Sequence, residues 1–302
     1  IGLRIEQWDA DYTDLWTDNG VFIGAVSASN QFAPDETMVG GHLALSYDWS
    51  DSWMSYARIA RGFKAGGFNP SLAALSGLDN VPSSQRISHE PEYLWNYELG
   101  VKLQSRDGSF VADANIFYMD RDNAQLSQSS QVDPTDPNTF FFITNNGEAQ
   151  EYGLESSFAW QAGAAFRFHG VFGWLESEID AWALRPDVIG RALAHAPNYT
   201  LSLGVIWEGD SGWQVKADML AVDGFYFDIS HDQNSESYQL LNLSVGKSWG
   251  RWSASVWGKN IFDETYATRG FFFGNEPPDF SPKLYTKLGD PQQVGLTAAY
   301  EF

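Results

Sequence analysis

Few side chains in this sequence have the types and spacing that catalysis needs. The five histidines are His42, His89, His169, His195 and His231, and cysteine is absent. A hydrolytic site requires a nucleophile or an acid pair within reach of an imidazole. No histidine here has a serine or aspartate at a spacing typical of such a site, and without cysteine there is no thiolate metal site. We therefore predict that the protein is not an enzyme and needs no cofactor.

Four aspartates near the N-terminus have the spacing of oxygen ligands for calcium. They are Asp9, Asp11, Asp14 and Asp18. A calcium loop of the EF-hand type also requires a central glycine and a closing glutamate. Neither is present at the required position, so the run is better interpreted as a solvated loop, and we predict no metal site.

An aromatic segment close to the C-terminus has the composition of a ligand contact. It reads RGFFFGNEPPDF, residues 269–280. Aromatic rings stack on planar ligands, and arginine pairs with anions. The candidate ligand contacts are Arg269, Phe271, Phe272, Phe273 and the nearby Tyr285. The alternative is that the segment packs against neighbouring loops.

Composition restricts the class of protein that carries these residues. The chain has 302 residues and a formal net charge of −21, and 16% of it is aromatic. Nucleic-acid binding depends on lysine and arginine that neutralise phosphates, so such an acidic chain is a poor candidate. No run of residues approaches the roughly 18 apolar residues of a transmembrane helix. Abundant aromatic residues without such a run are typical of a membrane β-barrel.

Apolar and polar residues alternate along most of the chain. For example, Leu201 and Leu203 share one face of a strand, and Ser202 and Gly204 share the other. A period of two indicates a strand with one apolar face. The pattern predicts an all-β, antiparallel transmembrane barrel with about twelve strands: 2–10, 40–49, 52–64, 92–104, 109–122, 148–160, 164–177, 197–208, 212–227, 238–249, 251–262 and 291–302.

The connections between these strands alternate between short and long. The tight turns are 50–51, 106–108, 161–163, 209–211 and 250, and the long connections are 11–39, 65–91, 123–147, 178–196, 228–237 and 263–290. Outer-membrane barrels combine short periplasmic turns with long extracellular loops. We therefore expect the long loops outside the cell and the C-terminus in the periplasm.

Charged residues occur on the strand faces opposite the apolar ones. In a barrel these faces line the lumen. The candidate lumen-facing charges are Arg58, Glu98, Lys102, Lys216 and Asp218. They can line a path or pair with a domain inside the barrel, and the alternative is that they pair with one another along the wall.

Five segments resemble, in order, the family of TonB-dependent outer-membrane receptors. They are YARIARGFKAGGFN (56–69), PEYLWNYELGVKLQSRDGSFVADANIFYMDRDNAQL (91–126), NNGEAQEYGLESSF (145–158), GKNIFDETYATRG (258–270) and GDPQQVGLTAAYEF (289–302). The terminal strand, with Tyr300 and Phe302, resembles the barrel-assembly signal of outer-membrane proteins. Together the segments cover nearly the whole chain.

The resemblance implies a 22-stranded barrel that encloses an N-terminal plug domain, with a TonB box before the plug. We expect residues 1–302 to be the C-terminal portion of such a barrel, with the plug and the TonB box absent from this sequence. The chain starts at Ile1 rather than at methionine, so we expect a mature or truncated product. It would be a fragment or one piece of a split receptor, because open sheet edges are not viable in lipid.

The resemblance also implies a function. We expect a receptor in the bacterial outer membrane that takes up a scarce nutrient with energy from TonB. The nutrient classes are a ferric siderophore, haem, cobalamin or an oligosaccharide. The implied partners are membrane lipid, lipopolysaccharide, the rest of the barrel and plug, TonB and the barrel-assembly machinery. The alternatives are a receptor-like barrel with a structural or assembly role, and a complete 12-stranded passive pore.

Overall fold

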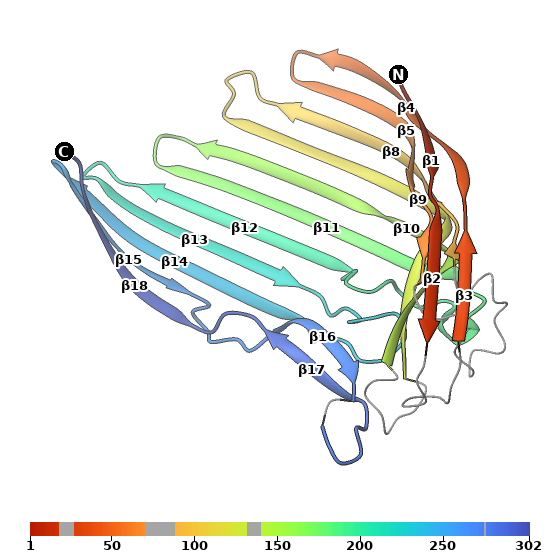
Figure 1. Cartoon of the computed structure of the whole chain (residues 1–302). Coiled ribbons are helices and arrows are strands. Elements are labelled where there is room, and N and C mark those ends of the chain that lie inside the picture. The colour runs from red at the N-terminus through yellow and green to blue at the C-terminus, as the bar shows by residue number, and fades with distance from the viewer. Residues whose placement is uncertain (18–26, 70–87, 132–139, 275) are drawn as a thin grey trace.

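The protein is built around one large antiparallel sheet. The computed structural model describes residues 1–17, 27–69, 88–131, 140–274 and 276–302. Within them, twelve strands follow one another across the sheet (Figure 1): β1 (Gly2–Asp9), β4 (Asp35–Ser50), β5 (Trp53–Lys64), β8 (Glu92–Gln104), β9 (Phe110–Gln131), β10 (Phe140–Ala162), β11 (Phe166–Ala181), β12 (Tyr199–Glu208), β13 (Trp213–Val222), β14 (Tyr238–Trp249), β15 (Trp252–Lys259) and β18 (Gln293–Tyr300). The all-β class and the twelve-stranded sheet are confirmed.

The sheet curves into an open trough (Figure 1). Strands β1 and β18 are its two edges, and each has only one neighbour in the sheet. Each remaining strand pairs with the strand before it and the strand after it in sheet order. The apolar residues of the edge strands, such as Leu3 and Leu296, are 74% and 73% exposed.

The two ends of the trough differ in their connections. At one end, tight turns join β4 to β5, β8 to β9, β10 to β11, β12 to β13 and β14 to β15, and we call this the short-turn end. At the opposite end lie the longer connections, and we call this the long-loop end. Gly212 and Gly250 have positive φ values of 79° and 56° in their turns, a conformation that costs glycine little. The C-terminus lies at the short-turn end (Figure 1), whereas the N-terminus lies partway along β4, where Gly2 pairs with His42.

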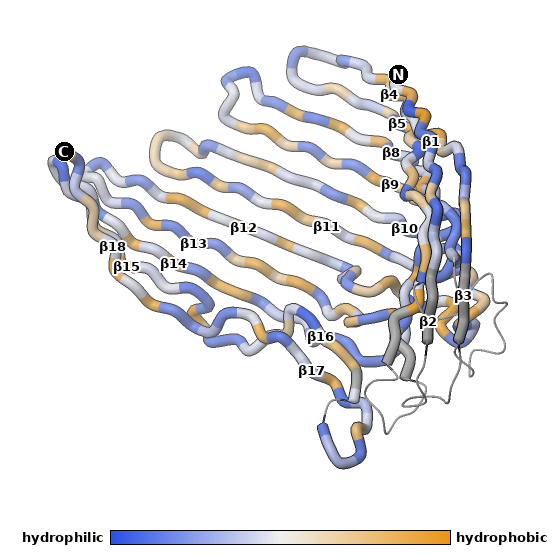
Figure 2. The backbone as a smooth tube through the Cα atoms, in the orientation of Figure 1, coloured by the Kyte–Doolittle hydropathy of each residue, from blue (hydrophilic) through white to orange (hydrophobic). Residues whose placement is uncertain are grey.

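The sheet has one apolar face and one polar face. Figure 2 shows the alternation along the strands. Because paired residues share a face, the register carries the pattern from strand to strand: Ala57 pairs with Leu99, and Leu99 pairs with Ile116. Leu99 is 57% exposed and Leu45 68% exposed. Contiguous apolar surface of this extent is rare on a soluble monomer and fits a hydrocarbon environment.

Helices contribute little to this fold. The structure has a single turn of 3-10 helix, η2 (Pro186–Val188), among the described residues. No described helix combines the length and apolar character that crossing a membrane requires.

The long connections contain strands of their own. Three small hairpins are formed by β2 (Tyr12–Thr17) with β3 (Ser27–Phe32), β6 (Gly67–Phe68) with β7 (Ser88–His89), and β16 (Ala267–Phe273) with β17 (Lys283–Leu288). Hairpin β2–β3 continues the direction of β1 and β4 beyond the sheet (Figure 1). Three of the expected long connections, 11–39, 65–91 and 263–290, therefore contain paired strands.

The expectation of a connection over residues 123–147 is wrong. Strands β9 and β10 stay paired as far as Gln131 and Phe140. A bulge accounts for the difference: Ala149 pairs with Arg121 and Gly147 with Ala124, so β9 carries one extra residue. An extra residue reverses which side chains of β9 face inward. The sequence period breaks at this point although the strand continues.

Candidate functional site

Three of the candidate lumen charges lie close together on the polar face. Arg58 and Glu98 are directly opposite each other in the β5–β8 register. The hydroxyl of Tyr56 donates a hydrogen bond to Glu98 over 2.5 Å. The ammonium of Lys102 lies 5.8 Å from the centre of the Tyr56 ring. Tyr56 and Lys102 also line a hollow of about 780 Å³ that reaches Asp113 and His169.

The other two candidate charges lie further along the same face. Lys216 and Asp218 alternate with apolar residues on β13, and Asp218 is opposite Gly204. The imidazole of His169 is 3.4 Å from the Asp218 carboxylate. A side chain at position 204 would collide with that ring, since a Cβ there would fall 2.2 Å from it. The five residues therefore form two groups on the polar face rather than one site.

Hairpin β16–β17 divides the aromatic candidates between two faces. Arg269, Phe271 and Tyr285 share one face, because Phe271 pairs with Tyr285 in register and Arg269 is two residues away. The Arg269 guanidinium lies 4.6 Å from the centre of the Phe271 ring. Arg269 and Phe271 are exposed, and Tyr285 is half-buried. Of Phe273 the structure describes the backbone, which pairs with Lys283.

The second face of the hairpin packs inward against the β13–β14 connection. The Phe272 ring lies 4.2 Å from the His231 ring, centre to centre. At position 270 a Cβ would fall 2.4 Å from the Phe227 ring, so glycine permits the close approach. Packing against a neighbouring loop therefore applies to the face with Phe272, and the face with Arg269 and Phe271 is exposed.

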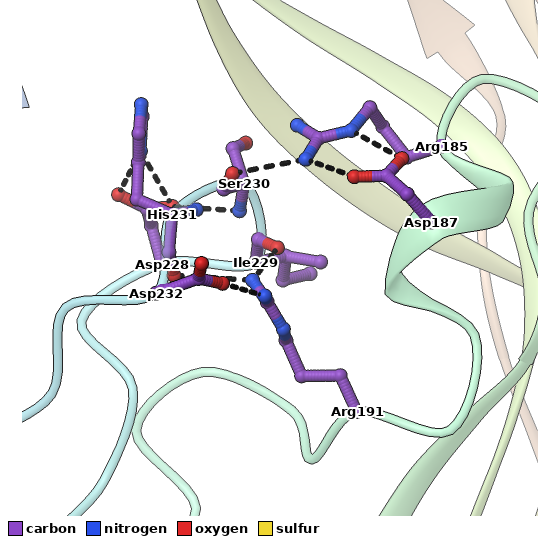
Figure 3. A network of polar contacts seen from close by, with 8 residues as sticks. All are labelled: Arg185, Asp187, Arg191, Asp228, Ile229, Ser230, His231 and Asp232. Carbon is purple, nitrogen blue, oxygen red and sulfur yellow. Dashed lines mark hydrogen bonds and ion pairs between the residues drawn. The ribbon is translucent and has the colours of Figure 1, made fainter.

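Two arginines attach the β11–β12 connection to the β13–β14 connection (Figure 3). Arg185 donates to both carboxylate oxygens of Asp187, over 2.8 and 2.7 Å, and to the Ser230 carbonyl over 3.0 Å. Arg191 donates to the carbonyls of Ile229 and His231, over 3.0 and 3.1 Å, and pairs with Asp232. These bonds join loops that are about 40 residues apart in the sequence.

Asp228 stabilises the turn to whose carbonyls these two arginines donate hydrogen bonds. Its carboxylate accepts hydrogen bonds from the backbone amides of Ser230 and His231, over 2.6 and 2.8 Å, and from Nδ1 of His231 over 2.9 Å. Burial alone would raise the pKa of Asp228, but the hydrogen bonds and charge of His231 hold that pKa below its usual value.

An apolar core lies beneath the connected loops. Trp182, Ile179 and Val188 are almost completely buried. The core also contains Ile229 from the second loop and apolar residues of the extended strands: Ala124, Leu126 and Ala149. We assigned residues 178–196 to a loop and missed this core. The signal was the apolar series Trp182, Leu184, Val188, Ile189 and Leu193 within that loop.

A buried ion triad was also missed. Arg121 donates to Glu92 over 2.6 Å and to Glu151 over 3.1 Å. The side chains of Glu92 and Glu151 are only 11% and 10% exposed. Because the three residues come from β8, β9 and β10, only the strand register brings them together.

The remaining candidates lie apart from the loops. Tyr300 packs against Trp252, with ring centres 4.9 Å apart, and against Phe302 at 5.3 Å. Phe302 is fully exposed at the short-turn end. In the described part of the chain no group of three or more potential ligands could hold a metal ion. Asp18 of the aspartate run lies outside the described residues, as does the side chain of Asp14.

A family model matches most of the chain. It is described as "TonB dependent receptor-like, beta-barrel" and matches residues 1–261. This is the same family that the five sequence segments resemble.

Curated relatives and solved structures agree with that match. The chain is 26% identical over 257 residues to the pesticin receptor of Yersinia pestis, covering 82% of this chain and 34% of that protein. It is 22% identical to the metal-pseudopaline receptor CntO of Pseudomonas aeruginosa, covering 90% of this chain and 35% of the relative. The ferric yersiniabactin uptake receptor FyuA of Yersinia pestis shares the fold, with a TM-score of 0.70, 21% identity, and coverage of 91% and 39%. The chain thus spans about a third of the length of these curated relatives.

Proposed function

The chain belongs to the family of TonB-dependent receptor-like β-barrels, and from that membership we propose that it takes part in TonB-energised uptake of a scarce nutrient. The family consists of outer-membrane receptors rather than enzymes. In this proposal residues 1–302 are the C-terminal portion of a larger barrel that encloses a plug, since the match covers only about a third of each relative.

The orientation follows from the two ends of the trough. We place the long-loop end outside the cell and the short-turn end, with the C-terminus, in the periplasm. The apolar face then contacts lipid, and the long-loop end meets lipopolysaccharide. The polar face, with Arg58, Glu98 and Lys102 on one side and Lys216 and Asp218 on the other, lines the lumen and meets the plug.

Our proposal for the ligand rests on the exposed face of hairpin β16–β17, which we call the open face. Arg269 and Phe271 are exposed there, beside the half-buried Tyr285. Phe272 on the opposite face fixes the hairpin against His231. A cation next to exposed rings suits a ligand that is both anionic and planar. Haem and siderophores with aromatic groups both fit this chemistry, and we propose a ferric siderophore because relatives are named for such ligands.

Uptake of radioactive iron by a strain that lacks its other siderophore receptors tests this proposal. We would supply iron as ferric yersiniabactin or ferric pyoverdine, the kinds of ligand named for relatives. We expect uptake that needs this protein and TonB. The double variant Arg269→Gln/Phe271→Ala should lower uptake at least tenfold, whereas Phe262→Ala, which truncates a 72% exposed ring elsewhere, should not. Uptake without TonB would contradict the energised mechanism.

Two alternative functions were considered, a complete 12-stranded pore and a structural or assembly role. A complete 12-stranded pore requires β1 to pair with β18, and these strands are opposite edges of the sheet. A structural or assembly role predicts a protein that reaches the cell surface but transports none of the ligands. We also propose that Tyr300 and Phe302 present the signal for the barrel-assembly machinery, with Phe302 left fully exposed for recognition.

A further inference from the structure

A small pocket at the long-loop end is separate from the proposed ligand face. It has a volume of about 250 Å³ and lies where β1, β3, β4 and hairpin β6–β7 meet. Its lining includes Trp8, Phe32, Glu36, Phe68, His89 and Glu90. Ligand pockets for drug-sized molecules occupy roughly 300–1,000 Å³, so this pocket suits one chemical group rather than a whole siderophore.

The apolar lining of the pocket is aromatic. Phe68 is stacked on Tyr12 with ring centres 4.5 Å apart, and Phe32 lies 5.8 Å from Phe68. Trp8 enters from β1, directly opposite Glu36 in the register. The face of an aromatic ring is electron-rich and attracts cations, and tryptophan does so most strongly.

The polar lining of the pocket has two unused hydrogen-bonding atoms. Oε2 of Glu36 and Nδ1 of His89 are both buried and have no hydrogen-bond partner among the residues that the structure describes. A carboxylate oxygen accepts hydrogen bonds, and Nδ1 of a neutral imidazole accepts one when the proton is on Nε2. Buried polar atoms normally have partners, so two such atoms lining one pocket point to a missing donor.

The charges around the pocket indicate what kind of hydrogen-bond donor it can bind. Burial raises the pKa of Glu36, and the negative charge of Glu90 raises it further. Burial lowers the pKa of His89, and the charge of Lys64 adds to that effect. The pocket thus contains acceptors and negative charge, and Lys64 forms no ion pair with Glu36 among the described residues. A positively charged donor would satisfy both orphaned atoms.

We propose that this pocket is a binding site for a small organic cation, an alkylammonium or guanidinium group taken from solution. The Glu36 carboxylate and Nδ1 of His89 would accept its hydrogen bonds, and Trp8, Phe32 and Phe68 would surround its charge. This site does not depend on the proposed transport function, because it uses none of the residues on the open face of β16–β17.

Calorimetric titration of the full-length protein in detergent tests the site. The probes are propylammonium chloride and guanidinium chloride at millimolar concentration, with sodium chloride at the same ionic strength as the reference. We expect saturable binding of at least one organic cation and none of sodium. Glu36→Gln should weaken binding at least tenfold and Trp8→Leu at least threefold. Glu236→Gln removes the same charge from an exposed position at the long-loop end and should leave binding unchanged.

Three results would overturn the proposal. They are the absence of saturable binding to the wild-type protein, equal binding by the Glu36→Gln variant, and equal binding of sodium. Thermal melting of each variant without probe shows whether it is folded. If Glu36→Gln does not fold, Trp8→Leu and Phe68→Leu provide the same comparison from the aromatic side.

Discussion

The two ends of the trough are stabilised in opposite ways. At the short-turn end the contacts are local: Asp107 accepts hydrogen bonds from Ser105 and Ser109, and Trp49 stacks on Trp53 with ring centres 5.4 Å apart. At the long-loop end the contacts join distant segments, and Ile229 packs in one core with Trp182. The short-turn end is thus a series of tight hairpins in which each is bonded only to its neighbours in the sheet, whereas the long-loop end is held by contacts between distant loops, like a small domain.

Loss of the loop core should have the largest effect on this difference. Trp182→Ala removes a side chain that is only 2% exposed, and truncation of a buried tryptophan costs about 3–5 kcal/mol. We expect proteases to cleave the β11–β12 and β13–β14 connections of the folded variant much faster. Trp213→Ala, which truncates a 42% exposed ring at the short-turn end, is the matched control. Equal cleavage of the two variants would show that the loops do not share a core.

Removal of the buried arginine should have the next largest effect. Arg121→Gln leaves Glu92 and Glu151 without their partner, and breaking a buried ion pair costs about 3 kcal/mol or more. Arg167→Gln breaks a pair between exposed side chains, 3.6 Å from Glu208, and should cost less than about 1 kcal/mol. Hydrogen exchange of the backbone amides of β8, β9 and β10 on the long-loop side of the bulge measures this difference in stability. Comparable exchange in both variants would contradict a special role for the triad.

Acidification should destabilise the turn at Asp228, by less than either of the two substitutions above. The pKa of Asp228 is lowered in the folded protein, so its contribution is present above its unfolded value of roughly 3.9. That contribution disappears as the pH falls through the lower folded value. Asp228→Asn should remove it at every pH, at a cost of about 1–2 kcal/mol, with faster exchange of the Ser230 and His231 amides. Asp232→Asn, at an 85% exposed carboxylate, is the control. If the protection of these amides, relative to their intrinsic exchange rates at each pH, does not change with pH in the wild type, the assignment is refuted.

The contrast between the short-turn end and the long-loop end also explains which parts of the structure the sequence could predict. Strands β8 and β14 coincide with the expected ranges 92–104 and 238–249, because a strand with one apolar face has a clear period of two. Strand β9 was expected to end at 122, where the bulge shifts the period, yet pairing continues to Gln131. Beyond the bulge the alternation is short and weak in the sequence: Ala124 and Leu126 pack into the loop core, while Gln125 and Ser127 between them face the other way.

The candidate site was predictable to a lesser degree. Residue type was enough to select Arg269, Phe271 and Phe272, but not to show that the register places Phe272 on the opposite face of the hairpin. Glu92, Arg121 and Glu151 are separated by about 30 residues each, so no local pattern joins them. The pocket at Glu36 requires β1, β4 and hairpin β6–β7 to converge, which only the folded chain reveals.

The long hairpin β9–β10 has a consequence for how such proteins diversify. Strand β9 has 22 residues and β8 has 13, a difference of about 30 Å at about 3.4 Å per residue. On one side Gln125 donates to the Ala65 carbonyl and Asn69 donates to the Thr144 carbonyl, and on the other side the hairpin supports Trp182. The Gln125 contact ends on a backbone oxygen of the neighbouring loop, which every residue type supplies, whereas the second contact requires the side chain of Asn69. A neighbouring loop that keeps this one asparagine can therefore exchange much of its remaining sequence during evolution and keep its attachment, so new ligand preferences can arise without rebuilding the scaffold.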